Sequence, residues 1–187
     1  MSPEHLEARR EQILAGARSA FARHGYEGTT VARLEQAVGL SRGAIFNYFP
    51  SKWAIFEAIA FREGRRYFEI ARAEGLDAVV REISTEAPEW LGVHLEAMNV
   101  IRTDPAIRER ALREGEGNID LVGWLGLLQE EGVLRRDVSA RDLARFVTAV
   151  LDGLSLRVAL GLEVDLDAFL RLLHGGIDAA RAPAQAQ

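Results

Sequence analysis

The segment 29–52 most constrains the fold of this chain, because it combines two short amphipathic runs with a tight turn between them. Apolar residues recur at helical spacing in both runs: Val31, Leu34, Ala37 and Val38 in the first, and Ala44, Ile45, Tyr48 and Phe49 in the second. Gly39 suits the left-handed backbone of a turn, and Ser41 can cap the helix that follows. Pro50 ends the second run. The segment is therefore predicted to form a helix-turn-helix.

The remaining sequence also repeats apolar residues at helical spacing, which predicts an all-α fold. A first helix carries Ile13, Leu14, Ala17, Ala20 and Phe21 and should end near Gly25. A fourth helix should begin after Ser51. Later helices are predicted at about 76–84, 88–102, 105–116, 118–131, 139–161 and 165–181. No alternating pattern of β-branched residues predicts a sheet.

Composition disfavours several classes of protein. The chain has 187 residues and no cysteine, which excludes disulfides, Cys-based zinc sites and a thiol nucleophile. It has no run of about 18 apolar residues, and its charged N-terminus lacks the apolar stretch of a signal peptide, so a cytoplasmic protein is expected. A phosphate-binding Gly loop, an HExxH motif and a Gly-x-Ser-x-Gly motif are absent, so an enzyme is disfavoured.

The charge is distributed unevenly along the chain. The formal net charge is −5, yet residues 1–52 hold seven basic residues against five acidic ones. A mildly basic head on an acidic body fits a protein that presents one end to a polyanion.

The second helix of a helix-turn-helix enters the major groove of DNA and presents its N-terminal residues to base edges. In this chain those residues are Ser41, Arg42, Gly43, Ala44 and Asn47. Arg42 can pair with guanine, whereas Asn47 can pair with adenine or reach a phosphate. The small residues between them let the backbone approach the DNA. A DNA-binding protein is therefore predicted, although pattern alone also allows an ordinary helical hairpin.

Residues from about 7 to 61 resemble the DNA-binding domain of the TetR family of bacterial regulators. The matching motifs are Ile13-Leu14-Ala15-Gly16-Ala17, Phe21-Ala22-Arg23-His24-Gly25-Tyr26, Thr29-Thr30-Val31, Ala37-Val38-Gly39-Leu40-Ser41, and Gly43 through Phe49 followed by Lys52. The chain departs from the family at Phe46, where tyrosine is frequent, and at Glu35, where alanine is common. The first departure removes a hydroxyl that could reach a phosphate.

The resemblance implies roles for individual residues. Thr30, Tyr48 and Lys52 would contact phosphates, which fixes the register of the protein on DNA. The complete predicted DNA-binding set is Thr29, Thr30, Ser41, Arg42, Gly43, Ala44, Asn47, Tyr48 and Lys52.

The resemblance also implies the domain organisation. Residues 1–52 would form the DNA-binding domain, with the helix-turn-helix at about 29–49. Residues 53–181 would form a helical domain for ligand binding and dimerisation, and the Ala/Pro/Gln-rich residues 182–187 are expected to be a disordered tail.

Two apolar stripes near the C-terminus predict a homodimer. The first stripe runs from Leu143 to Val158, and the second runs from Leu166 to Ile177. The residues predicted to meet the second copy are Phe146, Val150, Leu154, Val158, Phe169, Leu170, Leu173 and Ile177. The alternative is that both stripes only fill the core of the monomer. A two-fold dimer would place two recognition helices on a palindromic operator.

A ligand pocket is predicted around aromatic and methionine side chains. Trp90, His94 and Met98 share one helical face, and Trp124 lies on a later helix. The alternative is that these residues are plain core. His94, Asp152 and His174 match no metal-ligand spacing, so neither a metal nor another cofactor is expected.

Two further stretches are similar to regulators of the aconitase-repressor type within the family. They are Ile101-Arg102-Thr103-Asp104-Pro105 and Val150-Leu151-Asp152-Gly153. This similarity implies a small anionic effector, such as a tricarboxylate, with Arg102 or Arg157 as its partner.

These observations together predict a dimeric transcriptional regulator that binds double-stranded DNA. We expect a repressor that a small-molecule effector releases from its operator. The alternative is a DNA-binding regulator without such an effector, controlled by a protein partner or by its abundance.

Overall fold

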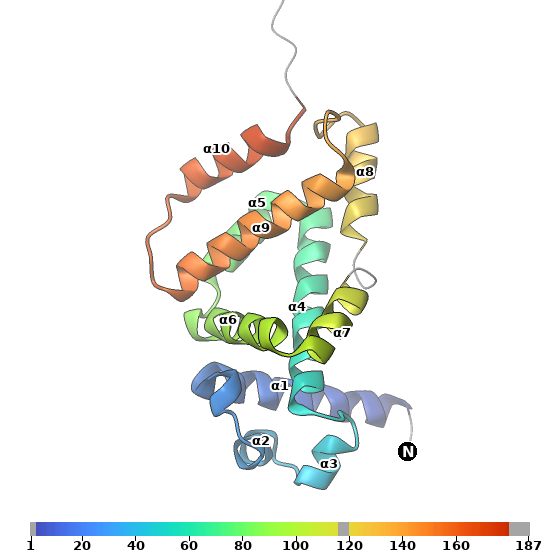
Figure 1. Ribbon diagram of the computed structural model, residues 1–187, viewed down its shortest axis with the longest axis vertical. Coiled ribbons are helices and arrows are strands. Elements are labelled where there is room, and N and C mark those ends of the chain that lie inside the picture. Colours follow the sequence, from blue (N-terminus) through green and yellow to red (C-terminus); the bar gives the residue numbers. More distant parts are fainter. Residues whose placement is uncertain (1–2, 116–119, 180–187) are drawn as a thin grey trace, which may run out of the picture.

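The computed structural model describes residues 3–115 and 120–179, and the side chains of residues 4–110 and 120–179. These described residues form ten helices, with one isolated antiparallel bridge between Leu134 and Asp178 (Figure 1). The all-α prediction is confirmed. The helices are α1 (Pro3–Gly28), α2 (Val31–Val38), α3 (Arg42–Phe46), α4 (Lys52–Glu74), α5 (Leu76–Thr85), α6 (Pro88–Thr103), α7 (Pro105–Gly115), α8 (Leu121–Glu130), α9 (Ala140–Ala159) and α10 (Leu166–Ile177). The predicted tail, residues 182–187, lies outside the described residues.

Helices α1 and α2 are separated by local backbone signals. The helical geometry of α1 breaks at Gly25, whose φ of 70° is in the left-handed region, and one further turn follows to Gly28. Thr30 then caps α2, because its side chain accepts a hydrogen bond from the backbone N–H of Arg33. Gly39, with φ of 73°, ends α2 and donates its N–H to the carbonyl of Glu35.

Serine caps begin the next two helices. The hydroxyl of Ser41 accepts the N–H of Ala44 at the start of α3, and that of Ser51 accepts the N–H of Ala54 at the start of α4. These caps fix where the short helix α3 begins and where the long helix α4 leaves it.

Two hydrophobic cores divide the molecule. The first contains α1 to α3, the first half of α4 and buried residues of α6, among them Trp90, Val93 and Ala97. The second is built from the later part of α4 together with α5, α8, α9 and α10. Helix α4 therefore crosses the predicted domain boundary at residue 52 and contributes side chains to both cores.

Helix α10 ends at Ile177, four residues before the predicted end at 181. The backbone of Asp178 is extended, and Ala179 donates its N–H to the carbonyl of Val133. In the same turn, the N–H of Arg135 donates to the carbonyl of Ile177 at 2.9 Å. These contacts with the α8–α9 connection stop the helix where sequence periodicity alone would continue it.

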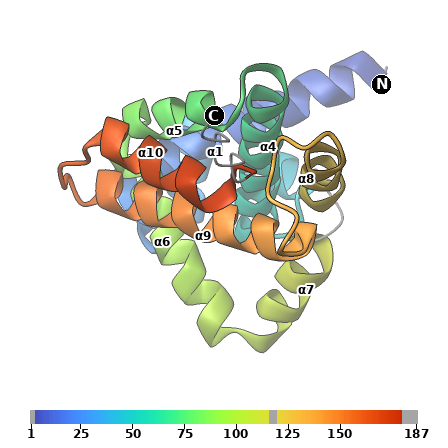
Figure 2. The ribbon, with the colours of Figure 1, turned by 90° about the horizontal axis from the view of Figure 1, so that it is seen from above.

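The arrangement places α1 to α3 at one end of the molecule, while α4 extends from them into the larger helical body (Figure 1). Seen from above, α9 and α10 run side by side on one face of that body (Figure 2). Within the described ranges, every helix is too short or too polar to cross a bilayer.

Candidate DNA interface and ligand cavity

Helix α3 presents a small polar edge at the end of the molecule. Arg42, Gly43 and Asn47 are exposed, Ala44 is half-buried, and Ile45 is fully buried against the first core. The guanidinium of Arg42 lies 5.8 Å from the centre of the Phe46 ring. The five-residue helix α3 therefore buries Ile45 and leaves the side chains of Arg42 and Asn47 open to solvent.

Glu35 has a structural role that sequence reasoning missed. Its carboxylate accepts a hydrogen bond from the backbone N–H of Arg42 at 2.6 Å. The contact ties α2 to the first residue of α3, and a carboxylate is favourable at a helix N-terminus. Glu35 and Arg42 are seven residues apart, on either side of the turn, so a contact between them was possible from the sequence. The sequence did not reveal the direction of the Glu35 side chain.

The predicted phosphate contacts fall into different environments. Thr30 is exposed and Tyr48 is half-buried. The ammonium of Lys52 donates to the carbonyl of Tyr26 at 2.7 Å and lies 4.3 Å from the centre of the Tyr26 ring. Partial burial lowers the pKa of Lys52, while the carboxylate of Glu27 opposes that change. Two of the three ammonium hydrogens of Lys52 stay free of this carbonyl bond.

Thr29 does not belong to an exposed DNA surface. Its exposed fraction is 1 %, and its hydroxyl lies 2.7 Å from the carbonyl oxygen of Gly25 and 3.2 Å from that of Ala20. The hydroxyl therefore satisfies carbonyl groups left open where α1 breaks. Its inclusion in the predicted DNA-binding set was wrong, because its side chain is buried against α1 whereas that of Thr30 is exposed.

A cavity of about 420 Å³ lies in the helical body and is lined by residues of α4, α5, α6, α8 and α9. This volume falls in the range of pockets that hold small molecules. Most of the lining is apolar, and the polar members include Glu63, His94 and Asp152. Of the predicted pocket residues, His94 and Met98 line this cavity.

Trp90 and Trp124 do not line the cavity. The exposed fraction of Trp90 is 1 %, and its ring packs between the guanidinium of Arg18 at 4.6 Å and the His94 ring at 5.0 Å. Trp124 packs edge-on against Phe68 at 5.8 Å. The pocket prediction was wrong for both tryptophans, because both rings serve as packing between helices.

Arg102 and Arg157 also lie outside the cavity lining. Arg102 donates to the side chain of Asn99 at 2.8 Å, and Arg157 donates to the backbone carbonyl of Glu163 at 3.0 Å. Both predicted partners for an anionic effector are exposed near helix ends. Neither arginine therefore supports a tricarboxylate in this cavity.

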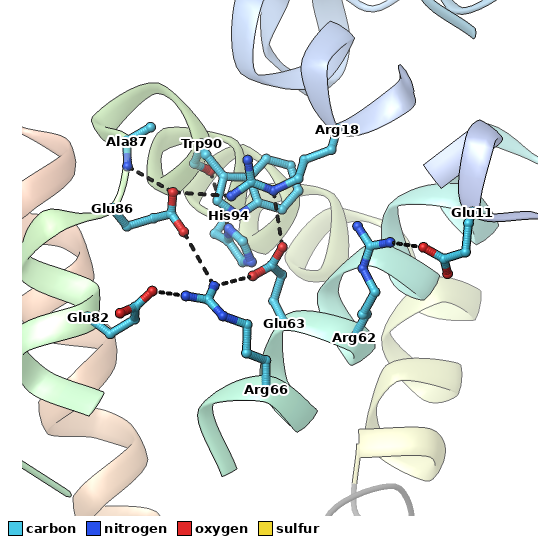
Figure 3. Close-up of polar contacts among 10 residues, drawn as sticks. All are labelled: Glu11, Arg18, Arg62, Glu63, Arg66, Glu82, Glu86, Ala87, Trp90 and His94. Atoms are coloured by element: carbon cyan, nitrogen blue, oxygen red, sulfur yellow. Dashed lines mark hydrogen bonds and ion pairs between the residues drawn. The ribbon is translucent and has the colours of Figure 1, made fainter. Parts of the chain in front are cut away.

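A cluster of charged side chains joins α1, α4 and the end of α5 (Figure 3). Glu63, which lines the cavity, accepts the Nε–H of Arg18 at 3.1 Å. Arg18 also pairs with Glu86 at 3.1 Å, and Arg66 pairs with Glu63 and Glu82. One carboxylate of α4 thus touches both the empty space of the cavity and the first helix of the DNA-binding end.

Burial changes the ionisation of two cavity groups. It lowers the pKa of His94, so the ring is held in its neutral form more strongly than a free histidine. Partial desolvation raises the pKa of Asp152, which is also exposed to solvent, and the nearby His94 opposes that change. His174 lies elsewhere, between Asp77 and Asp178, so the three residues weighed as metal ligands are not brought together.

The α9 and α10 stripes divide between the protomer core and its surface. Leu154, Leu170, Leu173 and Ile177 have exposed fractions of 6 % or less and pack in the second core. Their prediction as dimer contacts was wrong, because a side chain already covered within one protomer has almost no area left to bury. Phe146 is 43 % exposed, and Val150, Val158 and Phe169 are half-buried. Leu172, which was not predicted, is 77 % exposed.

Comparison with known proteins gives two family matches. Residues 13–59 match the model of bacterial regulatory proteins of the tetR family, and residues 72–182 match the C-terminal domain of BetI-type transcriptional repressors. The matches cover both the helix-turn-helix end and the helical body.

Similar proteins of known type cover most of the chain. The HTH-type transcriptional repressor AcnR of Corynebacterium diphtheriae is 41% identical over 170 residues, which is 88% of each chain. AcnR of Corynebacterium glutamicum is 38% identical over 173 residues, covering 90% of this chain and 92% of that protein. The solved structure of Salmonella enterica GusR superposes with a TM-score of 0.70 at 26% identity, covering 90% of this chain and 94% of that one.

Proposed function

The chain belongs to the TetR family of bacterial regulatory proteins and is a DNA-binding transcriptional repressor, and we propose that a small-molecule effector releases it, as a homodimer, from a palindromic operator. The observation that carries the effector part of this proposal is the double role of Glu63. This carboxylate lines the cavity and also holds Arg18 of α1. A molecule in the cavity can therefore alter a contact that positions the DNA-binding end.

Operator reading is assigned to the exposed edge of α3. Arg42 is the candidate for a bidentate contact with guanine, and Asn47 is the candidate for a contact with adenine. Lys52 and Thr30 would hold phosphates on either side of that edge. The short contact between Glu35 and the Arg42 backbone supports this assignment, because a recognition helix must be fixed against its partner helix to read a sequence.

Dimerisation is assigned to the α9–α10 face, defined as Phe146, Val150, Phe169 and Leu172. These side chains stay partly or largely exposed in one protomer, and the two helices run side by side (Figure 2). Covering such apolar surface stabilises an association by roughly 25 cal/mol per Å². In this arrangement a second copy would bring a second α3 to the DNA, as a palindromic operator requires.

The oligomeric state tests the α9–α10 face. We expect Leu172→Glu to shift the protein from dimer to monomer in light scattering, because a charge would be placed in an apolar interface. Leu127→Glu is the matched control, since Leu127 is 58 % exposed on α8 and lies outside this face. A dimer of unchanged strength in the Leu172 variant would contradict the assignment.

Effector action is assigned to a change in the joint between α1, α4 and α6. Arg18 meets Glu63 at 3.1 Å and the Trp90 ring at 4.6 Å, and Trp90 in turn contacts His94, which lines the cavity. These two contacts of Arg18 therefore each lead to a cavity residue, whereas its third contact is with Glu86. An effector shifts the DNA-bound population only by the difference between its affinities for the two arrangements of this joint.

Selection of bound DNA from a random pool, with and without a metabolite extract, is the direct test. We expect an enriched palindrome and its loss when the extract contains the effector. An asymmetric selected site would refute the dimeric reading. An enriched palindrome that no extract releases would favour control by a protein partner or by abundance.

Two variants then test the residue assignments by fluorescence anisotropy on the selected site. Arg42→Ala should weaken binding by about 1–3 kcal/mol and relax specificity at one position. Lys52→Ala should weaken binding to all sequences and reduce the salt dependence. Unchanged affinity in both variants would refute the assigned interface.

A further inference from the structure

Two carboxylates line the cavity, and only one of them is paired with arginine side chains. The two charged lining residues are Glu63 and Asp152, and no lysine or arginine is among the described residues that line the cavity. The rest of the lining is dominated by apolar side chains such as Phe68, Leu91 and Met98. The cavity thus offers a mostly apolar surface with two carboxylates.

The two carboxylates are not equivalent. Both oxygens of Glu63 are engaged, since Oε1 accepts from Arg18 at 3.1 Å and Oε2 accepts from Arg66 at 3.3 Å. Asp152 has no hydrogen bond or salt bridge among the residues that the structure describes, and it interacts electrostatically with His94, which also lines the cavity. Asp152 is therefore the carboxylate that is available to a ligand.

The imidazole beside Asp152 also offers an acceptor. Nδ1 of His94 lies 3.3 Å from the carbonyl oxygen of Trp90, and a carbonyl can only accept, so Nδ1 carries the hydrogen. In the neutral ring, Nε2 is then a hydrogen-bond acceptor. The hydroxyl of Ser155 donates to the carbonyl of Leu151 at 2.9 Å, which leaves only its lone pairs for a ligand. Beside the hydroxyls of Tyr67 and Thr148, the cavity lining therefore offers the acceptors of Asp152, His94 and Ser155.

We propose that the cavity takes a small organic cation, an apolar molecule that carries one protonated amine, with the amine held between Asp152 and His94. The proposal rests on the proposed function, because it names the chemical class of the effector for the same cavity. A protonated amine supplies a positive charge and several donors to groups that need both. A carboxylate ligand would instead meet Asp152 without a cation to pair with, and burying an unpaired charge is unfavourable.

Three probes of similar size test this class directly. They are 4-phenylbutylamine, 4-phenylbutanol and 5-phenylpentanoate, which share one phenylbutyl body and differ in the charge of the group at its end. Thermal unfolding is measured with each probe at millimolar concentration, since a ligand that binds the folded state raises the melting temperature by mass action. We expect the largest increase with the amine, a smaller one with the alcohol and none with the carboxylate.

Two variants locate the charge preference. Asp152→Asn should reduce the affinity for the amine about tenfold and leave the affinity for the alcohol unchanged. Glu69→Gln is the control, because it removes one negative charge from an exposed position of α4 outside the cavity lining. This control should bind all three probes as the natural sequence does.

The outcomes separate this proposal from the proposed function. Equal or tighter binding of the carboxylate, binding of citrate in metal-free buffer, no stabilisation by the amine, or an unchanged preference in the Asp152 variant would each overturn it. Operator affinity of the protein without any probe is measured in parallel by fluorescence anisotropy. If the amine binds through Asp152 but does not change operator affinity, the ligand class stands and the effector role fails.

Discussion

The ion pair between Arg18 and Glu63 should contribute measurably to stability, whereas a similar pair nearby should not. Both this pair and the pair between Arg62 and Glu11 join α1 to α4, at 3.1 Å and 2.7 Å respectively (Figure 3). The side chains of the first pair are 29% and 10% exposed, and those of the second are 37% and 51% exposed. The exposed pair should contribute at most about 0.5 kcal/mol, because solvent screens it.

The larger value for the buried pair follows from its burial, and its neighbours limit that value. A charged hydrogen bond in a partly dry site contributes roughly 1.5–3 kcal/mol. When Arg18 is replaced, Glu63 keeps Arg66, and when Glu63 is replaced, Arg18 keeps Glu86. These remaining partners reduce the loss, so we expect a coupling energy of about 1–1.5 kcal/mol between Arg18 and Glu63.

A double-mutant cycle measures this coupling. The free energy of unfolding in urea is compared for Arg18→Met, Glu63→Gln and the double variant, at one protein concentration because a dimer is expected. The same cycle with Arg62→Met and Glu11→Gln is the control, and the cation–aromatic contact of Arg18 with Trp90 cancels within the first cycle. Equal coupling energies in the two cycles would refute the argument that burial, and not distance, sets the strength of these pairs.

Three further predictions concern stability. Gly16→Ala should destabilise the fold by about 1–3 kcal/mol, because the added Cβ would lie 2.8 Å from backbone atoms of α2. Gly43→Ala should not destabilise the fold, because the space around Gly43 is open. Thermal unfolding of both variants checks this. Thr29→Val should cost about 1 kcal/mol in urea unfolding while operator affinity is retained, since the hydroxyl serves buried carbonyls. Hydrogen bonds to Asp178 and Asp77 raise the pKa of His174, so its contribution is full below pH about 6.5 and is lost as pH rises through the raised folded value. Urea midpoints should therefore fall more between about pH 6 and pH 8 in the natural sequence than in His174→Gln, and equal falls would refute this assignment.

The helix-turn-helix could be predicted because its signals are local. Gly39, Ser41 and Ser51 each act within three or four residues along the chain, and the structure uses them as two caps and a left-handed turn. The choice between Thr29 and Thr30 could not be made from sequence, since it depends on which threonine reaches the open carbonyls of α1.

The cavity was predicted less well because helical spacing gives a face but not its neighbour. Trp90, His94 and Met98 follow one another at intervals of four residues, and each interval turns about 40° around the helix. Over two intervals the environment changes from 1 % exposed at Trp90 to 54 % exposed at Met98. Only His94 and Met98 therefore reach the cavity, and Trp90 turns toward α1.

The predicted dimer face included residues that are buried in the protomer core, for a similar reason. A broad apolar stripe serves two surfaces, and its central residues, such as Leu154 and Leu173, enter the protomer core. The residues at its edges, such as Phe146 and Leu172, remain exposed. The sequence pattern shows that the apolar stripe is wide. The packing of α5 and α8 within the same protomer decides which residues of the stripe are already buried.

The continuous helix α4 has a consequence for protein engineering. Its first half completes the core of the DNA-binding end, and that core also requires Trp90, Val93 and Ala97 of α6. A fragment cut at residue 52 would lack these partners, so the DNA-reading end is not a module that can be excised or transplanted by itself. A hybrid repressor with a new operator specificity would keep its stability only if the exchanged segment carried matched residues on both α4 and α6.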